Sequence, residues 1–210
     1  IVDSSSSEVQ NLIKVFIADK KNVKYLWQKP SGISAAFNRG LENATAEWVW
    51  FLNGGDIVLD SLNEEFLFYI LKNSSSDALI FQIKEKQSGI ITRHPQMWAL
   101  WPPLLSWIPH PCTLTRRKLY EKYGYFDENY KIAMDYEFWV RCFSKDVIVD
   151  LVSIPISEFD QGGVSRKLND LTKSEVRKVI KKYFWLILKK WLYQAFIIIK
   201  SIKVSFKARE

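Results

Sequence analysis

Apolar and polar residues follow two different periods along the first half of the chain. Short apolar runs bounded by turn residues are typical of strands, and apolar residues every three or four positions are typical of helices. The pattern predicts a strand end at Ile1-Val2-Asp3, further strands at 23–27, 48–52 and 77–83, and helices at 8–17, 62–71 and from a Ser31 or Ser34 cap to Ala44. Strands that alternate with helices predict an α/β fold with a mostly parallel sheet flanked by helices.

This alternation stops after residue 84. Residues 97–108 hold three Trp and a Pro pair, which favour neither a regular helix nor a central strand. These rings either pack in the interior or form an aromatic shelf for a sugar or lipid. Beyond them the pattern predicts a strand at 110–115, a helix at 117–123 closed by Gly124, a turn at 126–128, a helix at 132–143, a strand at 147–152 and a loop at 161–165.

A single long helical pattern covers residues 173–207. One side carries Ile180, Phe184, Ile187, Trp191, Ile198 and Ile202, and the opposite side carries Lys178, Lys182, Lys189, Lys200, Lys203 and Lys207. No uncharged run in it approaches the ~20 residues that span a bilayer. The pattern predicts an amphipathic helix whose apolar side sinks into membrane headgroups or packs on the protein itself or a second subunit.

Composition and charge narrow the class of protein. The 210 residues are 48% hydrophobic, enough for one domain with a core, and the two Cys and two His residues indicate no zinc site, disulfide framework or histidine cluster. This cysteine usage fits a reducing compartment. From Val164 onward there are 13 Lys+Arg and 3 Asp+Glu, whereas residues 1–163 have 17 and 20. We therefore expect an acidic body at 1–165 that does not bind nucleic acid, and a basic tail at 166–210 that meets an anionic surface.

Carboxylates stand at three places where a ligand could bind. The predicted strand at 48–52 ends in Asn53-Gly54-Gly55-Asp56, and in open α/β sheets ligands bind at the carboxyl ends of strands. A carboxylate there suits a divalent cation that holds a phosphate, although a glycine-rich turn with a solvated Asp is the alternative. Asp3 also follows a strand, and Asp135 lies in the first turn of a predicted helix, where it is either functional or a simple helix N-terminal acid.

Four blocks of sequence resemble the family 2 glycosyltransferases of GT-A fold. They are IVDSSSSE, SGISAAFNRGLENATAEWVWFLNGGD, HPCTLTRRKLYEKYGYFDENYKIAMDYEFWVRC and QGGVS, which together cover about residues 1–165. The likeness is greatest to bacterial enzymes that build surface polysaccharide. In that family the first strand carries the opening sugar-nucleotide motif. Because that motif is missing here and the chain begins inside a strand, we expect an amino-terminal truncation.

The resemblance implies roles for the three carboxylates. Asp3 matches the acid that holds the nucleotide base, and Asn53 to Asp56 match the acidic motif that binds Mg²⁺ or Mn²⁺. Only Asp56 remains of the usual acid pair, which leaves fewer ligands for the metal. Asp135 matches the catalytic base, preceded by Met134 where many relatives carry Glu.

Further site residues are implied around these carboxylates. Asn38 and Arg39 lie in the helix that lines the donor side, together with Asn53 and Gly55 of the acidic motif. Gly162 and Gly163 match a loop near the donor diphosphate and the acceptor. His110 either touches the acceptor or is a buried structural histidine, and Glu137 is expected to be solvated or in a salt bridge.

The resemblance implies an inverting glycosyltransferase, and the basic tail predicts that it lies on the cytoplasmic face of the cell membrane. It would move a sugar from a nucleotide-diphosphate donor to a hydroxyl of a glycan or lipid-linked acceptor, with one base acting opposite the leaving group. Two alternatives remain at this point. A transferase-like binding module could lack turnover, because its acidic motif is depleted. Another nucleotide-sugar enzyme such as a pyrophosphorylase is also possible, although its glycine-rich, basic phosphate loop is not visible near the start of the chain.

Overall fold

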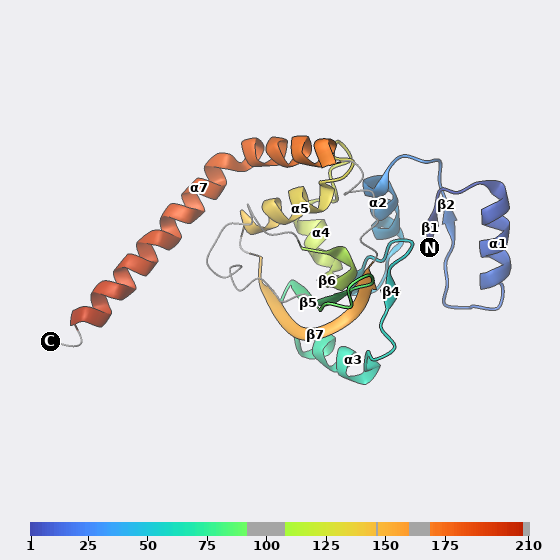
Figure 1. The fold of residues 1–210 in the computed structure, drawn as a ribbon, viewed down its shortest axis with the longest axis horizontal. Helices are drawn as coiled ribbons and strands as arrows, with labels where there is room; N and C mark the ends of the chain where they lie inside the picture. The colour runs from blue at the N-terminus through green and yellow to red at the C-terminus, as the bar shows by residue number, and fades with distance from the viewer. Residues whose placement is uncertain (92–107, 146, 160–168, 208–210) are drawn as a thin grey trace.

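A computed structural model describes residues 1–91, 108–145, 147–159 and 169–207. Its centre is a curved five-stranded sheet with the strand order β3-β6-β5-β7-β4, and a separate two-stranded sheet pairs β1 with β2 (Figure 1). The strands are β1 (Val2–Asp3), β2 (Leu26–Trp27), β3 (Trp48–Trp50), β4 (Ile57–Val58), β5 (Ala78–Glu85), β6 (Thr113–Arg116) and β7 (Val149–Phe159).

The sheet is mixed, which corrects the expectation of mostly parallel strands within a confirmed α/β class. β5 pairs with β7 in parallel, as β1 does with β2. The pairs β3–β6, β5–β6 and β4–β7 are antiparallel. An apolar run indicates that a strand is buried, but it does not indicate whether the strand runs parallel or antiparallel to its neighbour. Alternation of strands with helices therefore predicts the wrong strand direction wherever a strand joins the sheet without a crossover helix before it.

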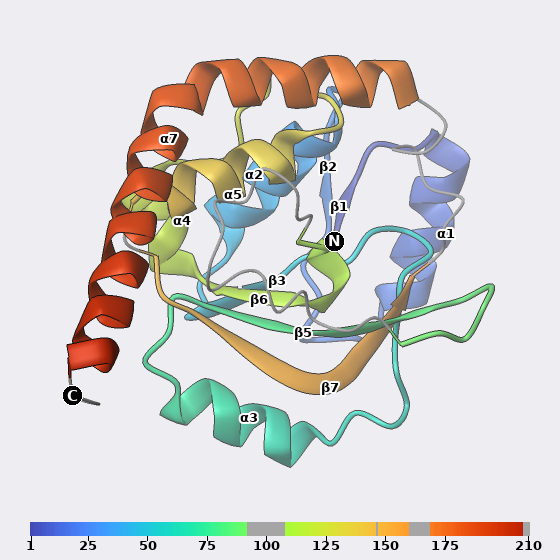
Figure 2. The same ribbon diagram turned by 60° about the vertical axis from the view of Figure 1, so that its left-hand side comes forward.

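The described helices either cover a face of the five-stranded sheet or lie outside those that do. They are α1 (Ser7–Ile17), α2 (Ile33–Asn43), α3 (Glu64–Asn73), α4 (Arg117–Tyr123), α5 (Met134–Phe143) and α7 (Asn169–Lys207). α3 covers one face, and α2, α4 and α5 lie on the other (Figure 2). Alternate residues of β5 serve the two cores: Ala78 and Ile80 pack with α4 and α5, and Leu79 and Phe81 pack with Leu67 of α3.

Several predicted boundaries shift for local reasons. The helix predicted at 117–123 is confirmed, with Gly124 at its end at φ +89°. The strand predicted at 110–115 begins instead as a short 3-10 turn, His110–Cys112, because Pro111 offers no N–H to a ladder. The strand predicted at 147–152 is β7 and extends to Phe159. The loop 161–165 lies outside the described residues, as does all of the Trp-rich segment except Ile108.

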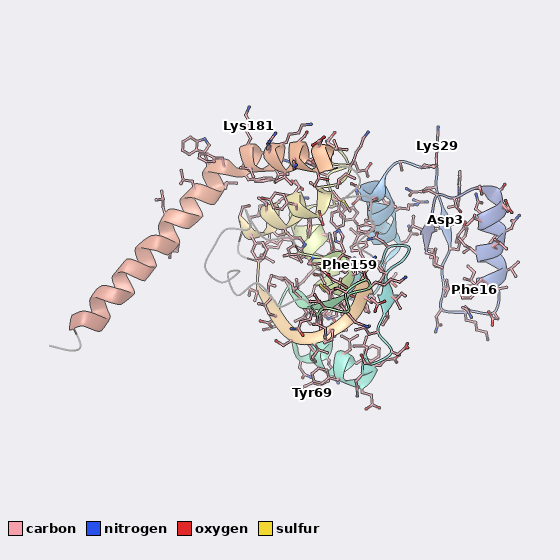
Figure 3. All side chains as sticks on the ribbon, viewed as in Figure 1. Asp3, Phe16, Lys29, Tyr69, Phe159 and Lys181 are labelled. Atoms are coloured by element: carbon pink, nitrogen blue, oxygen red, sulfur yellow. The ribbon has the colours of Figure 1, made fainter. Side chains whose placement is uncertain are left out.

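The long C-terminal helix has two different environments. Its N-terminal part lies over α5, where Val179 and Tyr183 are buried, and its C-terminal part projects away from the body (Figure 1). The adjacent Phe184 and Trp185 are exposed, and Lys181 points outward (Figure 3). No helix in the described parts of the chain is long and apolar enough to cross a membrane. Part of the helix thus packs on the protein itself, and a second apolar face remains exposed.

Candidate functional site

The acidic turn after β3 places Asp56 at the edge of the sheet. Gly55 adopts φ +102°, a left-handed conformation that favours glycine, and this lets the chain reverse within the motif. Asp56 Oδ2 then accepts the N–H of Asn53 at 2.8 Å. Partial burial raises the pKa of Asp56, although the Asn53 N–H and the nearby His110 oppose this shift. The carboxylate is therefore fixed in a tight turn and only partly solvated.

His110 sits beside that turn in a box of aromatic rings. Its ring centroid lies 5.2 Å from Phe37, 6.4 Å from Phe51 and 6.1 Å from Phe126, in edge-on geometry. Burial among these rings lowers the pKa of His110, and attraction to Asp135 and Asp56 offsets part of that effect. Because the lowered pKa keeps the imidazole neutral near pH 7, it does not neutralise either carboxylate.

Asp135 completes the group from the first turn of α5. Its Oδ2 lies 3.4 Å from His110 Nε2, and its Oδ1 accepts the N–H of Tyr136 at 2.7 Å. The side chain of Asp135 is buried, with 5% of the residue exposed. Three residues far apart in sequence, Asp56, His110 and Asp135, thus converge on one place. We call this group the acid–histidine centre.

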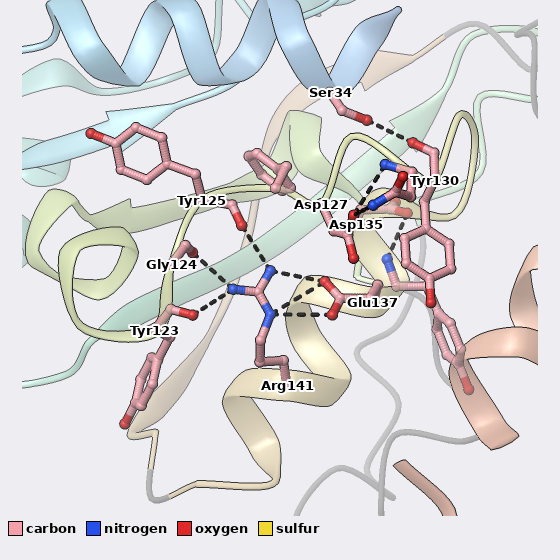
Figure 4. A network of polar contacts seen from close by, with 12 residues as sticks. Ser34, Tyr123, Gly124, Tyr125, Asp127, Tyr130, Asp135, Glu137 and Arg141 are labelled. Atoms are coloured by element: carbon pink, nitrogen blue, oxygen red, sulfur yellow. Dashed lines mark hydrogen bonds and ion pairs between the residues drawn. The ribbon is translucent and has the colours of Figure 1, made fainter. Parts of the chain in front are cut away.

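A buried ionic network stabilises the helix that carries Asp135. Glu137, only 1% exposed, accepts hydrogen bonds from the Arg141 guanidinium, which also donates to the carbonyls of Tyr123, Gly124 and Tyr125 (Figure 4). Sequence reasoning foresaw a salt bridge for Glu137 but also allowed it to be solvated, and the structure removes that second possibility. The signal was the Glu-to-Arg spacing of four residues, which places both on one helix face.

The C-terminal helix also contributes polar groups to α5. Lys182 Nζ lies 3.2 Å from Glu137 Oε1, and Tyr183 donates its hydroxyl to the same oxygen at 2.5 Å. Glu175 accepts the backbone N–H groups of residues 131, 132 and 133, each at 2.9 Å. Sequence reasoning missed these contacts, because they join segments about forty residues apart whose pairing no short-range pattern reveals.

The predicted donor-side residues of α2 lie in two different settings. Asn38 is buried, and its amide exchanges hydrogen bonds with the Phe126 backbone and donates to Glu128. Arg39 is on the surface, 3.4 Å from Glu42. Asn38 thus ties α2 to the turn before the α5 loop. The donor-binding roles of both residues remain predictions.

Asp3 lies apart from the acid–histidine centre, in the two-stranded sheet (Figure 3). Its carboxylate accepts hydrogen bonds from the Ser5 N–H at 3.0 Å, the Ser5 hydroxyl at 2.7 Å and the Tyr25 hydroxyl at 2.7 Å. Desolvation acts to raise the pKa of Asp3, but these hydrogen bonds outweigh it and hold the pKa below its usual value. Asp3 is thus a charged acceptor at a strand end, and its role at the nucleotide base remains a prediction.

The sequence of this chain matches a known protein family. The family model described as glycosyl transferase family 2 matches residues 1–140.

The chain belongs to glycosyl transferase family 2.

Curated relatives of this chain are described as glycosyltransferases. A protein of Rickettsia prowazekii (strain Madrid E), described as an uncharacterized glycosyltransferase, is 26% identical over 156 residues, which cover 68% of this chain and 48% of that protein. A second uncharacterized glycosyltransferase, from Methanocaldococcus jannaschii, is 22% identical over 157 residues and covers 70% and 54%. The chain spans about half the length of the curated relatives that it matches.

Solved structures confirm the GT-A fold expected from the sequence. The crystal structure of S. aureus TarS superposes with a TM-score of 0.63 at 19% identity, covering 93% of this chain and 37% of that one. TarS 1-349 in complex with UDP-GlcNAc gives a TM-score of 0.59 at 21% identity, with 76% and 48% covered. At these identities the likeness establishes the fold alone.

The family 2 acidic motif fits a divalent cation only if the donor shares in holding it. Within the described ranges, no three His, Cys, Asp or Glu side chains are grouped to hold a metal ion. Mg²⁺ is commonly bound through one or two carboxylates together with substrate phosphates and water. Partial burial raises the pKa of Asp56, and a cation would offset that burial by stabilising the charged form. Gly162 and Gly163 lie outside the described residues.

Proposed function

We propose that this family 2 chain carries an inverting glycosyltransferase centre formed by Asp56, His110 and Asp135. The observation that carries the proposal is the convergence of Asp56 and Asp135 on His110, which lies 3.4 Å from Asp135 and close enough to Asp56 for that carboxylate to act against the lowering of its pKa. Two carboxylates with separate tasks are what sugar transfer from a diphosphate requires: one at the leaving group and one at the acceptor. A binding module would have no use for a buried base beside the acidic motif.

The reaction assigns one task to each carboxylate. The acceptor hydroxyl attacks the anomeric carbon of the donor sugar, its proton passes to the Asp135 carboxylate, and the bond from that carbon to the diphosphate oxygen breaks. Attack opposite the leaving group inverts the anomeric configuration. Burial lowers the pKa of His110, so the imidazole places no positive charge 3.4 Å from the Asp135 carboxylate that would accept the proton.

Asp56 serves the donor side of the centre. When bound, a divalent cation such as Mg²⁺ or Mn²⁺ supplies Lewis-acid stabilisation of the departing diphosphate. Asp56 would hold that cation at the edge of the sheet, beside the diphosphate. The crystal structures of TarS 1-349 in complex with UDP and with UDP-GlcNAc make uridine diphosphate sugars the first donors to test.

A screen of radiolabelled nucleotide sugars with Mn²⁺ and a mixture of glycan and lipid-linked acceptors tests the proposal. We expect at least one donor to yield labelled product together with free nucleoside diphosphate, and NMR of the product to show an inverted anomeric centre. Binding of nucleotide sugars with no turnover of any of them would instead favour the binding module.

Asp56→Ala should remove most of the metal dependence of donor binding. We expect the affinity for UDP in Mn²⁺ to fall about tenfold or more, since removal of a metal ligand forfeits the bridge to the diphosphate. Calorimetric titration with and without EDTA measures this effect, and Asp60→Asn, an exposed acid nearby, is the control. Equal UDP affinity of parent and variant in both conditions would show that Asp56 holds no metal.

We further propose that the exposed face of α7 docks on the inner face of the cell membrane, where a lipid-linked acceptor would lie. Five large apolar residues of this helix are exposed, namely Phe184, Trp185, Leu186, Leu192 and Tyr193. A shallow groove there is lined by Arg177, Lys181 and two of these rings. Aromatic rings at the headgroup level with cations beside them favour an anionic bilayer surface, at about 1 kcal/mol for each basic residue near it.

Vesicle co-sedimentation with a Phe184→Ser/Trp185→Ser double variant tests this surface without disturbing the buried contacts of α7. We expect the parent to bind vesicles that contain phosphatidylglycerol, binding to fall with salt, and the double variant to bind about tenfold more weakly. Phe68→Ser/Tyr69→Ser, which removes two exposed rings from α3, is the matched control and should bind like the parent. A parent that ignores anionic vesicles, or a double variant that binds equally well, would refute the docking.

A further inference from the structure

The segment that leads into the helix bearing Asp135 lacks a cap of its own. α5 begins at Met134, and its N-cap residue, Ala133, makes no side-chain capping hydrogen bond. Such a helix start commonly gains stability when a nearby Glu accepts the N-cap N–H, as in a capping box. The third residue of α5 is Tyr136, which cannot do this. The start of the helix therefore needs an acceptor from elsewhere.

Glu175 of α7 supplies that acceptor from 42 residues away. Its Oε1 accepts the N–H of Lys131, and its Oε2 accepts the N–H groups of Ile132 and Ala133, all at 2.9 Å. The residue is 3% exposed, so this carboxylate has exchanged water for three backbone donors. Such charge-assisted hydrogen bonds are stronger than neutral ones. A buried carboxylate with both oxygens engaged holds three consecutive residues in one conformation.

These three residues end two positions before Asp135. Ala133 is the N-cap, and Asp135 follows two residues later, with its Oδ2 3.4 Å from His110. A displacement of the N-cap would rotate the first turn of α5 and move the Asp135 carboxylate relative to His110 and the acidic turn. Displacements of about 1 Å in a reacting group can cost about a hundredfold in rate.

We infer that Glu175 is a positioning residue for the reaction, which fixes the Asp135 carboxylate by capping α5 from the C-terminal helix. This inference rests on the proposed function for its kinetic meaning. It gives Glu175 of α7 a positioning role in the reaction, although this residue lies beyond residue 140, where the family match ends. The C-terminal helix then has two parts: one that orders the centre and an exposed one further along.

Glu175→Gln is the sharpest variant, because it keeps size and shape. A glutamine has one acceptor oxygen, so an amide NH₂ must face at least one of the three N–H donors. We expect kcat to fall about tenfold to a hundredfold while the affinity for UDP with Mn²⁺ stays within about twofold. In an Asp135→Asn background the same change should cost no further activity, since the residue acts through Asp135.

Val179→Ala separates positioning from ordinary stability. Val179 is fully buried one turn further along α7, and its truncation loosens the packing of the helix but keeps the Glu175 hydrogen bonds. It should lower the Tm while kcat stays within about twofold of the parent. A Glu175→Gln variant with the kcat of the parent, or a Val179→Ala variant that loses as much kcat for a similar loss of Tm, would overturn the inference.

A structural readout keeps this result separate from the proposed function. If the parent turns over no donor, the proposed function fails, and the crystal structure of Glu175→Gln decides the inference alone. A lengthened distance between Asp135 Oδ2 and His110 Nε2, with faster amide exchange at residues 131–133, would support the positioning role. An unchanged centre and unchanged exchange would overturn it.

Discussion

Asp135→Asn should reduce glycosyl transfer by about a thousandfold while the affinity for the donor changes little. A general base contributes about 10²- to 10⁴-fold, and the amide of asparagine cannot accept the acceptor proton. The substitution keeps the size of the side chain and an oxygen that can accept the Tyr136 N–H, so α5 should fold as in the parent. The loss should thus appear in kcat rather than in donor affinity.

Steady-state transfer assays with the donor found by screening, paired with UDP titration, measure both quantities. Asp60→Asn makes the same chemical change at an exposed acid outside the acid–histidine centre and should retain the parent rate. If Asp135→Asn keeps activity within a few-fold of the parent, the general base lies elsewhere.

Glu137→Ala should destabilise the fold by about 3–5 kcal/mol, the usual cost of breaking a buried ion pair on one side only. Glu137 is 1% exposed and receives hydrogen bonds from Arg141, Lys182 and Tyr183. Removing it deprives the Arg141 guanidinium, whose own side chain is 15% exposed, of the carboxylate with which it forms an ion pair. The cost is large because that cation has little water to replace the carboxylate.

Urea unfolding followed by circular dichroism gives the free energy of unfolding of each variant. Glu64→Ala, at an exposed acid in the first turn of α3, should cost only a few tenths of a kcal/mol. A loss below about 1 kcal/mol for Glu137→Ala would mean that the network contributes no more than a surface salt bridge.

Many of the helices and strands of this protein can be predicted from local sequence patterns. The helix at 117–123 ends at its glycine as expected, and the apolar runs at 48–52 and 77–83 are strands of the sheet. The acids at Asp56 and Asp135 were singled out because each stands at a strand or helix end where backbone geometry favours a ligand or anion. Two roles were expected for His110, either contact with the acceptor or a structural place in the interior. In the structure its side chain lies near both Asp56 and Asp135.

The pairing of strands and helices that lie far apart in the sequence could not be predicted, for a physical reason. Strand direction depends on which partner a strand meets, and three of the five described pairings are antiparallel where a parallel sheet was expected. The C-terminal helix was expected to have one apolar side. It uses Val179 and Tyr183 against α5, one residue away from the predicted face at Ile180 and Phe184. The hydrogen bonds that buried Glu175 accepts from three backbone N–H groups produce no periodic pattern in the sequence.

The location of the reaction centre can be tested most directly by a crystal structure with Mn²⁺ and UDP, read by anomalous scattering from the metal. An anomalous peak at the Asp56 carboxylate, with the diphosphate beside it and Asp135 and His110 facing the vacant sugar side, is the predicted result. Mn²⁺ and UDP bound together at another place on the chain would contradict the assignment of Asp56, His110 and Asp135 as the site of sugar transfer.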